Sequence, residues 1–269
     1  TVTIFGAASA PGARKGPKSL MSDFNRGYAR TVPADRADMS VDAGLRSFML
    51  GVYNKVALGL VLSAALAFLT GTFEPVRNLM FSVSETGRVG YTPLGMIVAF
   101  APLVVMLFGA FAMKNVTPRS SGIFYWTIVS LIGAGLGVLT FVYTGASIFS
   151  TFLITAAAFG GLSLFGYTTK KDLTGFGSFL IIGLFGLIIA SLVNMFLHNG
   201  MMGFIISVLG VFIFAGLIAY DTQRLKMSYY QMGGDEAAMG VATNYGALNL
   251  YLNFINLFQF LLSIFGDRR

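Results

Sequence analysis

The chain of 269 residues contains no cysteine and only one histidine, His198. Without cysteine it can form no disulfide, and it can offer no thiolate to a metal, an iron–sulfur cluster or a substrate. A single histidine also excludes a metal site built from several imidazoles. The sequence therefore predicts no resident cofactor.

Charge is scarce as well. Only 11% of the residues are charged and 55% are apolar, whereas a soluble domain carries about 25% charged residues. So few charges could not cover a soluble surface, so we expect an all-α, polytopic membrane protein whose first partner is the lipid bilayer. The formal net charge of +7 lies in tails and loops beside the apolar runs, which indicates membrane orientation rather than nucleic-acid binding.

Seven apolar runs are long enough to cross a membrane, which takes about 20 residues each. Backbone groups in lipid must pair within their own segment, so each run should be a helix. The last run is the weakest because asparagines and Gln259 interrupt it, and it either crosses the membrane or re-enters. The runs are Ser47–Thr70, Leu94–Met113, Ile123–Tyr143, Ile148–Tyr167, Phe176–Leu197, Met202–Asp221 and Ala247–Phe265.

The first 45 residues differ from the rest. They are rich in Pro, Gly, Ala and basic side chains and show little periodicity, which predicts a disordered cytoplasmic tail before a transmembrane domain at 46–269. No apolar core follows the basic residues before Met39, so the tail is not a signal peptide. Met21 resembles a natural start, and we expect residues 1–20 to lie upstream of the native chain.

Lysine and arginine placement predicts the orientation. With a cytoplasmic N-terminus, most of these residues face the cytoplasm, and only Arg77, Arg88, Arg268 and Arg269 lie outside. This asymmetry favours an N-inside, C-outside chain with seven spans. If the last run re-enters, Arg268 and Arg269 move to the cytoplasmic side.

One charge stands out as a candidate site. Asp221 ends the apolar run Phe204–Tyr220, and an ionisable residue at a membrane helix end indicates function by default. The next run carries a polar stripe at helical spacing, which we expect to face the bundle. A carboxylate facing such a stripe indicates a cation or proton path; the alternative is helix–helix hydrogen bonding and a cytoplasmic cap. The stripe consists of Tyr245, Asn249, Asn253 and Asn256.

Three segments of the second half resemble the Bax inhibitor-1/YccA family, and the resemblance extends from about Ser47 to the C-terminus. It implies a seven-helix bundle with the seventh helix central, in the bacterial inner membrane. The family is associated with a proton-sensitive calcium leak, and its bacterial branch includes an interactor of a membrane AAA+ protease. The segments are Phe152–Leu173 (FLITAAAFGGLSLFGYTTKKDL), Gly216–Gln223 (GLIAYDTQ) and Leu248–Phe258 (LNLYLNFINLF).

The resemblance also implies a site near the cytoplasmic side, where aspartates of the sixth and seventh helices can form a dyad. Asp221 matches the first aspartate, but Asn253 stands at the position of the second. Two close carboxylates can share a proton near neutral pH, whereas asparagine cannot titrate. Hard-cation affinity grows with the number of carboxylates, so any transient Ca²⁺ at Asp221 should bind weakly.

Two lysines belong to this prediction. Lys114 resembles the position where family members place a basic partner for the dyad, and a Lys114–Asp221 pair would close the pore mouth. The alternative is a lysine that extends to the headgroups. Lys55, inside the first run, either does the same or reaches a carboxylate in the bundle.

Two functions follow from these patterns. The first is a membrane regulator with a calcium, cation or proton leak at Asp221; the alternative is a non-conducting modulator that binds a membrane AAA+ protease. An enzyme is not expected. Gly161-Leu162-Ser163 resembles a rhomboid-like serine motif, but His198 should lie at the opposite membrane face. The sequence gives no indication of the oligomeric state.

Overall fold

The structure, a computed structural model, describes residues 42–84, 89–112 and 116–269. The expected N-terminal tail lies outside these ranges apart from its last residues, and so does Lys114. The first described helix begins at Ala43, three residues before the expected start of the transmembrane domain.

Helices make up most of the described chain, and two short antiparallel strands, β1 (Phe81–Val83) and β2 (Val89–Tyr91), form the one pairing between strands in it. A 3₁₀ turn, η2 (Leu136–Val138), joins two of the helices. The helices are α2 (Ala43–Thr72), α3 (Glu74–Met80), α4 (Pro93–Ala112), α5 (Pro118–Gly135), α6 (Leu139–Val142), α7 (Gly145–Thr168), α8 (Thr174–Leu197), α9 (Gly200–Met232) and α10 (Glu236–Phe265).

Six helical segments of the described chain are long and apolar enough to cross a membrane. They are α2, α5 continued through α6, α7, α8, α9 and α10. This confirms an all-α, multi-pass membrane protein. Helix α4 is a shorter apolar helix, counted over Pro93–Gly109, so the seventh span remains a prediction.

The hydropathy pattern underestimated the lengths of two helices, α9 and α10. Helix α9 continues from Asp221 to Met232, and α10 begins at Glu236 rather than Ala247, because these extensions are helical but too polar to look like a membrane span. Gly233, at φ 61°, ends α9 in the left-handed conformation that suits glycine. Asp221 therefore lies inside a helix, and the prediction that it serves as a cap is wrong.

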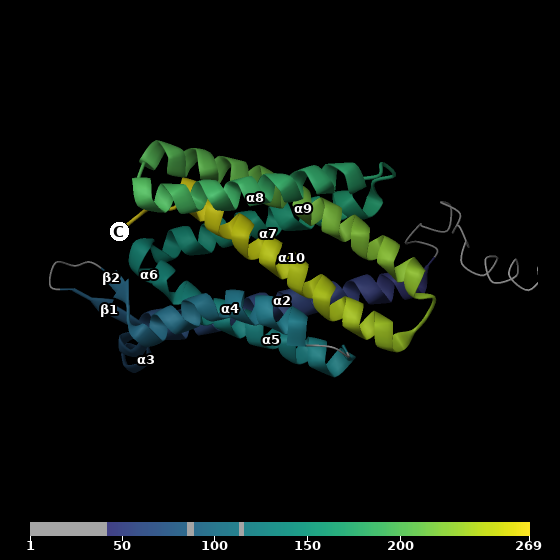
Figure 1. Cartoon of the computed structure of the whole chain (residues 1–269), viewed down its shortest axis with the longest axis horizontal. Coiled ribbons are helices and arrows are strands. Elements are labelled where there is room, and N and C mark those ends of the chain that lie inside the picture. Colours follow the sequence, from purple (N-terminus) through teal and green to yellow (C-terminus); the bar gives the residue numbers. More distant parts are fainter. Residues whose placement is uncertain (1–41, 85–88, 113–115) are drawn as a thin grey trace, which may run out of the picture. The chain divides into compact units, whose positions relative to one another are not determined.

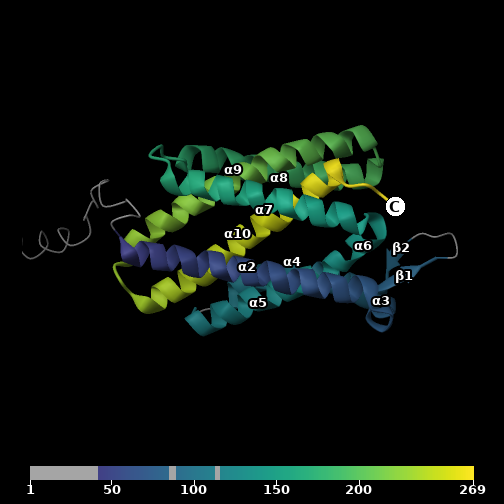
Figure 2. The ribbon, with the colours of Figure 1, turned by 180° about the vertical axis from the view of Figure 1, so that it is seen from behind.

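Helix α10 occupies the centre of the bundle. It packs against α2 and α5 on one side and α7 and α9 on the other, and Figures 1 and 2 show it running between these groups. In its apolar part 56% of the residues are buried, against 11% for α8. The last helix is thus the one on which the other helices assemble.

Polar side chains attach α10 to its neighbours. The amide of Asn244 donates to the hydroxyl of Ser121 on α5 at 2.8 Å, and the hydroxyls of Tyr251 and Ser63 on α2 lie 2.6 Å apart. Ser263 makes a further hydroxyl contact with α9. Such bonds hold membrane helices together where apolar contacts alone give no preference for protein over lipid.

The two ends of α10 reach opposite ends of the bundle. At its start, Asn244 donates to the carbonyl of Pro118, the first residue of α5. At its end, the carbonyl of Asp267 accepts a bond from the backbone of Thr144, beyond α6. Thirty residues span about 45 Å, so α10 runs the length of the bundle and is long enough to cross a membrane; that it crosses rather than re-enters stays a prediction.

Single-cysteine labelling tests this crossing, since the chain has no native cysteine. Ala237→Cys, before the apolar part of α10, and Arg269→Cys, after it, are both exposed positions. A membrane-impermeant maleimide should label Arg269→Cys in intact spheroplasts and Ala237→Cys only after permeabilisation. Labelling of both from the same side would contradict the crossing.

Helices α7 and α9 approach closely at one glycine. A Cβ atom at Gly166 would lie 2.1 Å from the carbonyl oxygen of Ala219, and backbone atoms of a packed helix cannot move aside cheaply. At Gly160, on the same helix, an added Cβ would meet nothing within 4 Å.

We therefore expect Gly166→Ala to destabilise the protein by about 1–3 kcal/mol, the cost of overpacking. Gly160→Ala is the matched control, and it should be neutral or stabilising by up to ~1 kcal/mol because alanine favours helix. Unfolding in detergent, followed by circular dichroism, measures both. Equal stability of the two variants would show that α7 and α9 do not meet at Gly166.

Candidate functional site

The structure brings Asp221 and Asn253 together. The Nδ2 amide of Asn253 on α10 donates to Oδ2 of Asp221 on α9 at 2.7 Å, a charge-assisted bond when the carboxylate is ionised. Asn253 is only 7% exposed. The residue expected at the second position of the dyad thus contacts the carboxylate as a donor.

Helices α2 and α7 place hydroxyl groups at Thr222, the residue that follows Asp221 on α9. Thr222 is fully buried, and its hydroxyl donates to the carbonyl of Ile218 at 2.8 Å. The hydroxyl of Tyr53 on α2 faces the hydroxyls of Thr222 and Ser163. Four helices therefore contribute polar groups to this part of the bundle.

The predicted polar stripe is only partly internal. Asn253 is buried, and Tyr245 and Asn256 are half-buried, but Asn249 is exposed. The prediction that all four face inward is wrong at Asn249, because no described helix covers that side of α10 at its level. Asn256 donates to the carbonyl of Leu252 within its own helix at 2.8 Å, so only Asn253 reaches Asp221.

The two lysines have different outcomes. Lys114 lies outside the described residues, so its pairing with Asp221 stays a prediction. Lys55 donates from Nζ to the amide oxygen of Asn244 and lies 5.9 Å from the ring centre of Tyr125. Within the described ranges it contacts no carboxylate, so its partner is a buried amide that neither alternative named.

Sequence reasoning missed this second polar cluster. Asn244 is 3% exposed and links Lys55 on α2 to Ser121 on α5, while the hydroxyl of Tyr125 donates to the backbone carbonyl of Lys55 at 2.7 Å. Asn244 precedes the apolar run that begins at Ala247, so a search restricted to the run could not find it. The signal was the polar residue one turn before the run.

The glutamine of the Asp-Thr-Gln segment fixes a loop. Gln223 donates to the carbonyl of Lys171 and accepts from the backbone of Leu173, both at 2.8 Å. These bonds hold the α7–α8 loop against α9. In the same loop, hydrogen bonds from Thr174 lower the pKa of Asp172 below its ordinary value, so this carboxylate stays ionised while it accepts the backbone N–H of Thr174.

The arrangement restricts the possible chemistry. Among the described residues, no three acidic or histidine side chains gather as metal ligands, so a cation at Asp221 would meet one carboxylate beside amide and hydroxyl oxygens. Ser163 lies near the end of α7, and His198 follows the far end of α8. The 24 residues of α8 span about 36 Å, so these two residues form no catalytic pair.

Comparison with known proteins identifies the chain's relatives. The family described as "Inhibitor of apoptosis-promoting Bax1" matches residues 45–269. An uncharacterized protein of Caulobacter vibrioides is 68% identical over 93% of this chain and 100% of its own length. The inner membrane protein YbhL of Escherichia coli K12 is 40% identical over 84% of this chain and 94% of its length. An uncharacterized membrane protein of Streptococcus pyogenes is 36% identical over 84% of this chain and 94% of its own length.

The pair at the site can be tested by stability. Asn253→Ala removes the donor to Asp221 and should lower the free energy of unfolding by about 1–3 kcal/mol, because a buried carboxylate loses its partner. Asn249→Ala is the control on the same helix, and it should change stability by less than ~0.5 kcal/mol. Unfolding in mixed micelles measures both; an equal loss in the two variants would contradict the assigned bond.

Proposed function

Because the chain belongs to the Bax inhibitor-1 family, we propose that it is a regulator of the bacterial inner membrane with a slow calcium, cation or proton leak controlled at Asp221. In this proposal the N-terminus is cytoplasmic and seven helices, α4 included, cross the membrane. The structure then represents the closed state.

The observation that carries the proposal is the Asp221–Asn253 bond between α9 and the central helix. An ionisable group within a membrane bundle is costly and usually serves a function. Asp221 lies about three turns before α9 ends at Met232, and the next residue, Thr222, meets a hydroxyl from α2. Among the described residues of α2, α7, α9 and α10, Asp221 is the only carboxylate that is not exposed. A cation that crossed between these helices would therefore meet its negative charge at Asp221.

The same bond explains why the state is closed. The donor of Asn253 is used by Asp221, and the neighbouring Thr222 hydroxyl is used by its own helix. An ion that takes both oxygens of Asp221 would have to displace the Asn253 amide from Oδ2, which requires this contact between α9 and α10 to open locally. Lys114 would strengthen the closed state if it pairs with Asp221.

The presence of one carboxylate rather than two determines the pH dependence and the calcium affinity that we expect. An asparagine neither gains nor loses a proton, so the pair has no shared proton to release near neutral pH. Calcium affinity also falls with fewer charged oxygens. We therefore propose a leak that is small and depends weakly on pH.

The second candidate function is a non-conducting modulator of a membrane AAA+ protease. The observation that favours it is the pairing of polar groups along α10, where Asn244, Tyr251 and Asn253 all bond to neighbouring helices. Groups that serve only to hold the bundle together would be arranged in this way. The two functions differ in whether ions cross.

Calcium flux into liposomes tests the leak. The wild type should show a small flux that varies little from about pH 6 to 8, and Asp221→Asn should abolish it. Asn253→Asp places a second carboxylate against Asp221, so the pair would share a proton. We expect this variant to bind calcium more tightly and to show a several-fold change in flux across the same pH range.

Asn249→Asp is the matched control, since it adds the same charge at an exposed position of the same helix. It should behave as the wild type does. A steep response in the wild type that Asn253→Asp leaves unchanged would place the gate elsewhere. Absence of flux from both the wild type and Asn253→Asp would reject the leak in favour of the protease modulator.

A further inference from the structure

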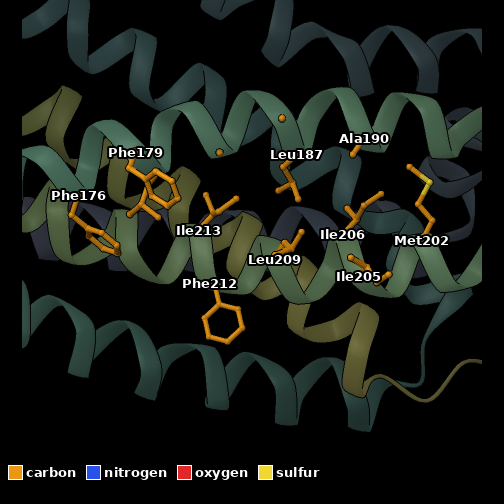
Figure 3. A pocket seen from close by; sticks show the side chains of 13 residues that line it. Phe176, Phe179, Leu187, Ala190, Met202, Ile205, Ile206, Leu209, Phe212 and Ile213 are labelled. Carbon is orange, nitrogen blue, oxygen red and sulfur yellow. The ribbon is translucent and has the colours of Figure 1, made fainter.

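An apolar groove lies between α8 and α9, away from Asp221. Its volume is about 630 Å³, within the range of pockets that hold small ligands. Figure 3 shows that carbon and one methionine sulfur are the side-chain atoms that face it. Its lining residues include Phe176, Leu187 and Ala190 on α8 and Met202, Leu209 and Ile213 on α9.

Small residues on α8 create this groove. A Cβ at Gly186 would meet nothing within 4 Å, whereas one at Gly183 would contact the Ile213 side chain of α9 at 3.4 Å, so the open space lies beside Gly186 and the small residue Ala190. From Phe176 to Ala190 the groove follows about 21 Å of helix. This is longer than one leaflet of the hydrocarbon core, which is about 15 Å deep as half of ~30 Å.

One end of the groove meets a basic cluster. Lys170 and Lys171 precede α8, and Gln223 holds their loop against α9. Arg224 lies on the groove side of α9, because it continues the helical spacing of Ile213, Gly216 and Tyr220. We call Lys170, Lys171 and Arg224 the basic cluster; all three side chains are exposed.

The basic cluster carries excess positive charge. The one ion pair within 4 Å among the described residues joins Arg77 to Glu74, but Arg224 also interacts electrostatically with the carboxylate of Asp221, three residues before it on α9. Asp172 lies next to the cluster in sequence, but its carboxylate accepts the backbone N–H of Thr174. With Asp172 and an ionised Asp221 both included, the cluster still has a net charge of about +1, at the level where a membrane helix begins.

We propose that the groove and the basic cluster together form a binding site for one anionic phospholipid. Its acyl chain would lie between α8 and α9, and its phosphate would contact Lys170, Lys171 and Arg224. The uncharged lining excludes a polar chain from the groove, and the charge of the cluster selects an anionic headgroup over a zwitterionic one. The acyl end of the site lies away from Asp221, whereas Arg224 at its headgroup end also interacts electrostatically with Asp221; lipid binding does not require that the protein conduct ions.

Native mass spectrometry of the detergent-purified full chain tests this site. Dioleoyl phosphatidylglycerol, dioleoyl phosphatidylcholine and glycerol 3-phosphate serve as separate probes. We expect one saturable phosphatidylglycerol, bound about tenfold more tightly than phosphatidylcholine. Glycerol 3-phosphate, which has the headgroup chemistry but no acyl chain, should bind at least tenfold more weakly than phosphatidylglycerol.

Two variants separate the acyl and headgroup contributions. Gly186→Phe fills the groove and should weaken phosphatidylglycerol at least tenfold, whereas Gly160→Phe, equally open but on α7, should not. Replacing the basic cluster by glutamine should remove the preference for phosphatidylglycerol. The control replaces Arg46 and Arg119 by glutamine in the same way; both arginines are exposed, and both lie at the same end of the bundle as the basic cluster (Figure 1). Lys171→Gln changes only the side chain, so the backbone carbonyl of residue 171 can still accept the hydrogen bond from Gln223.

Circular dichroism and size-exclusion chromatography confirm that each variant is folded. Equal affinity for the two lipids, or equal effects of Gly186→Phe and Gly160→Phe, would overturn the proposal. Tight binding of glycerol 3-phosphate alone would reassign the basic cluster to a soluble phosphate. An effect of the Arg46 and Arg119 control as large as that of the cluster would show only general attraction to anionic lipid, and would also overturn it.

Discussion

The structure depends on one constraint: polar groups inside a membrane bundle must find their partners within the protein. Helix α10 meets it with side chains that bond to different neighbours. Asn244 faces α2 and α5, Tyr251 faces α2, and Asn253 faces α9. Apolar packing alone would give α10 little preference for one rotation over another, because lipid tails are as apolar as leucine. The polar bonds therefore fix both its depth and its rotation.

The replacement of a carboxylate by an amide at Asn253 changes the physics of this constraint. Two carboxylates 2.7 Å apart would have to share a proton, so their contact would depend on pH. An amide donates to a carboxylate without any exchange of protons, at the distance the structure shows. Asp221 remains the one titrating member of this contact, so no proton is shared between two carboxylates across α9 and α10.

The sequence predicted the membrane helices better than it predicted their ends and partners. Long apolar runs locate α2, α7 and α8 within a few residues, because lipid demands such runs. The polar extensions of α9 and α10, the short helix α3 and the β1–β2 hairpin have no comparable signal and were missed. Contact between Asp221 and Asn253 could be expected from the family resemblance, whereas the Lys55–Asn244 contact depends on how three helices pack. Asn249 shows the same limit, since helical spacing defines a face but not whether another helix covers it.

Burial differs across the bundle in a way that links packing to lipid. Helix α10 buries 56% of its apolar window and α8 only 11%, and α8 packs mainly against α9. Association of helices in lipid relies on close van der Waals contact, which is missing across the groove at Gly186. At the loop end the two helices do pack closely, at Gly177 against Tyr220 and at Gly216 against Leu180. There Gln223 adds hydrogen bonds on both sides of Asp172. Helix α8 is therefore held at its end by packing and hydrogen bonds and along its length by contacts that a lipid chain would complete.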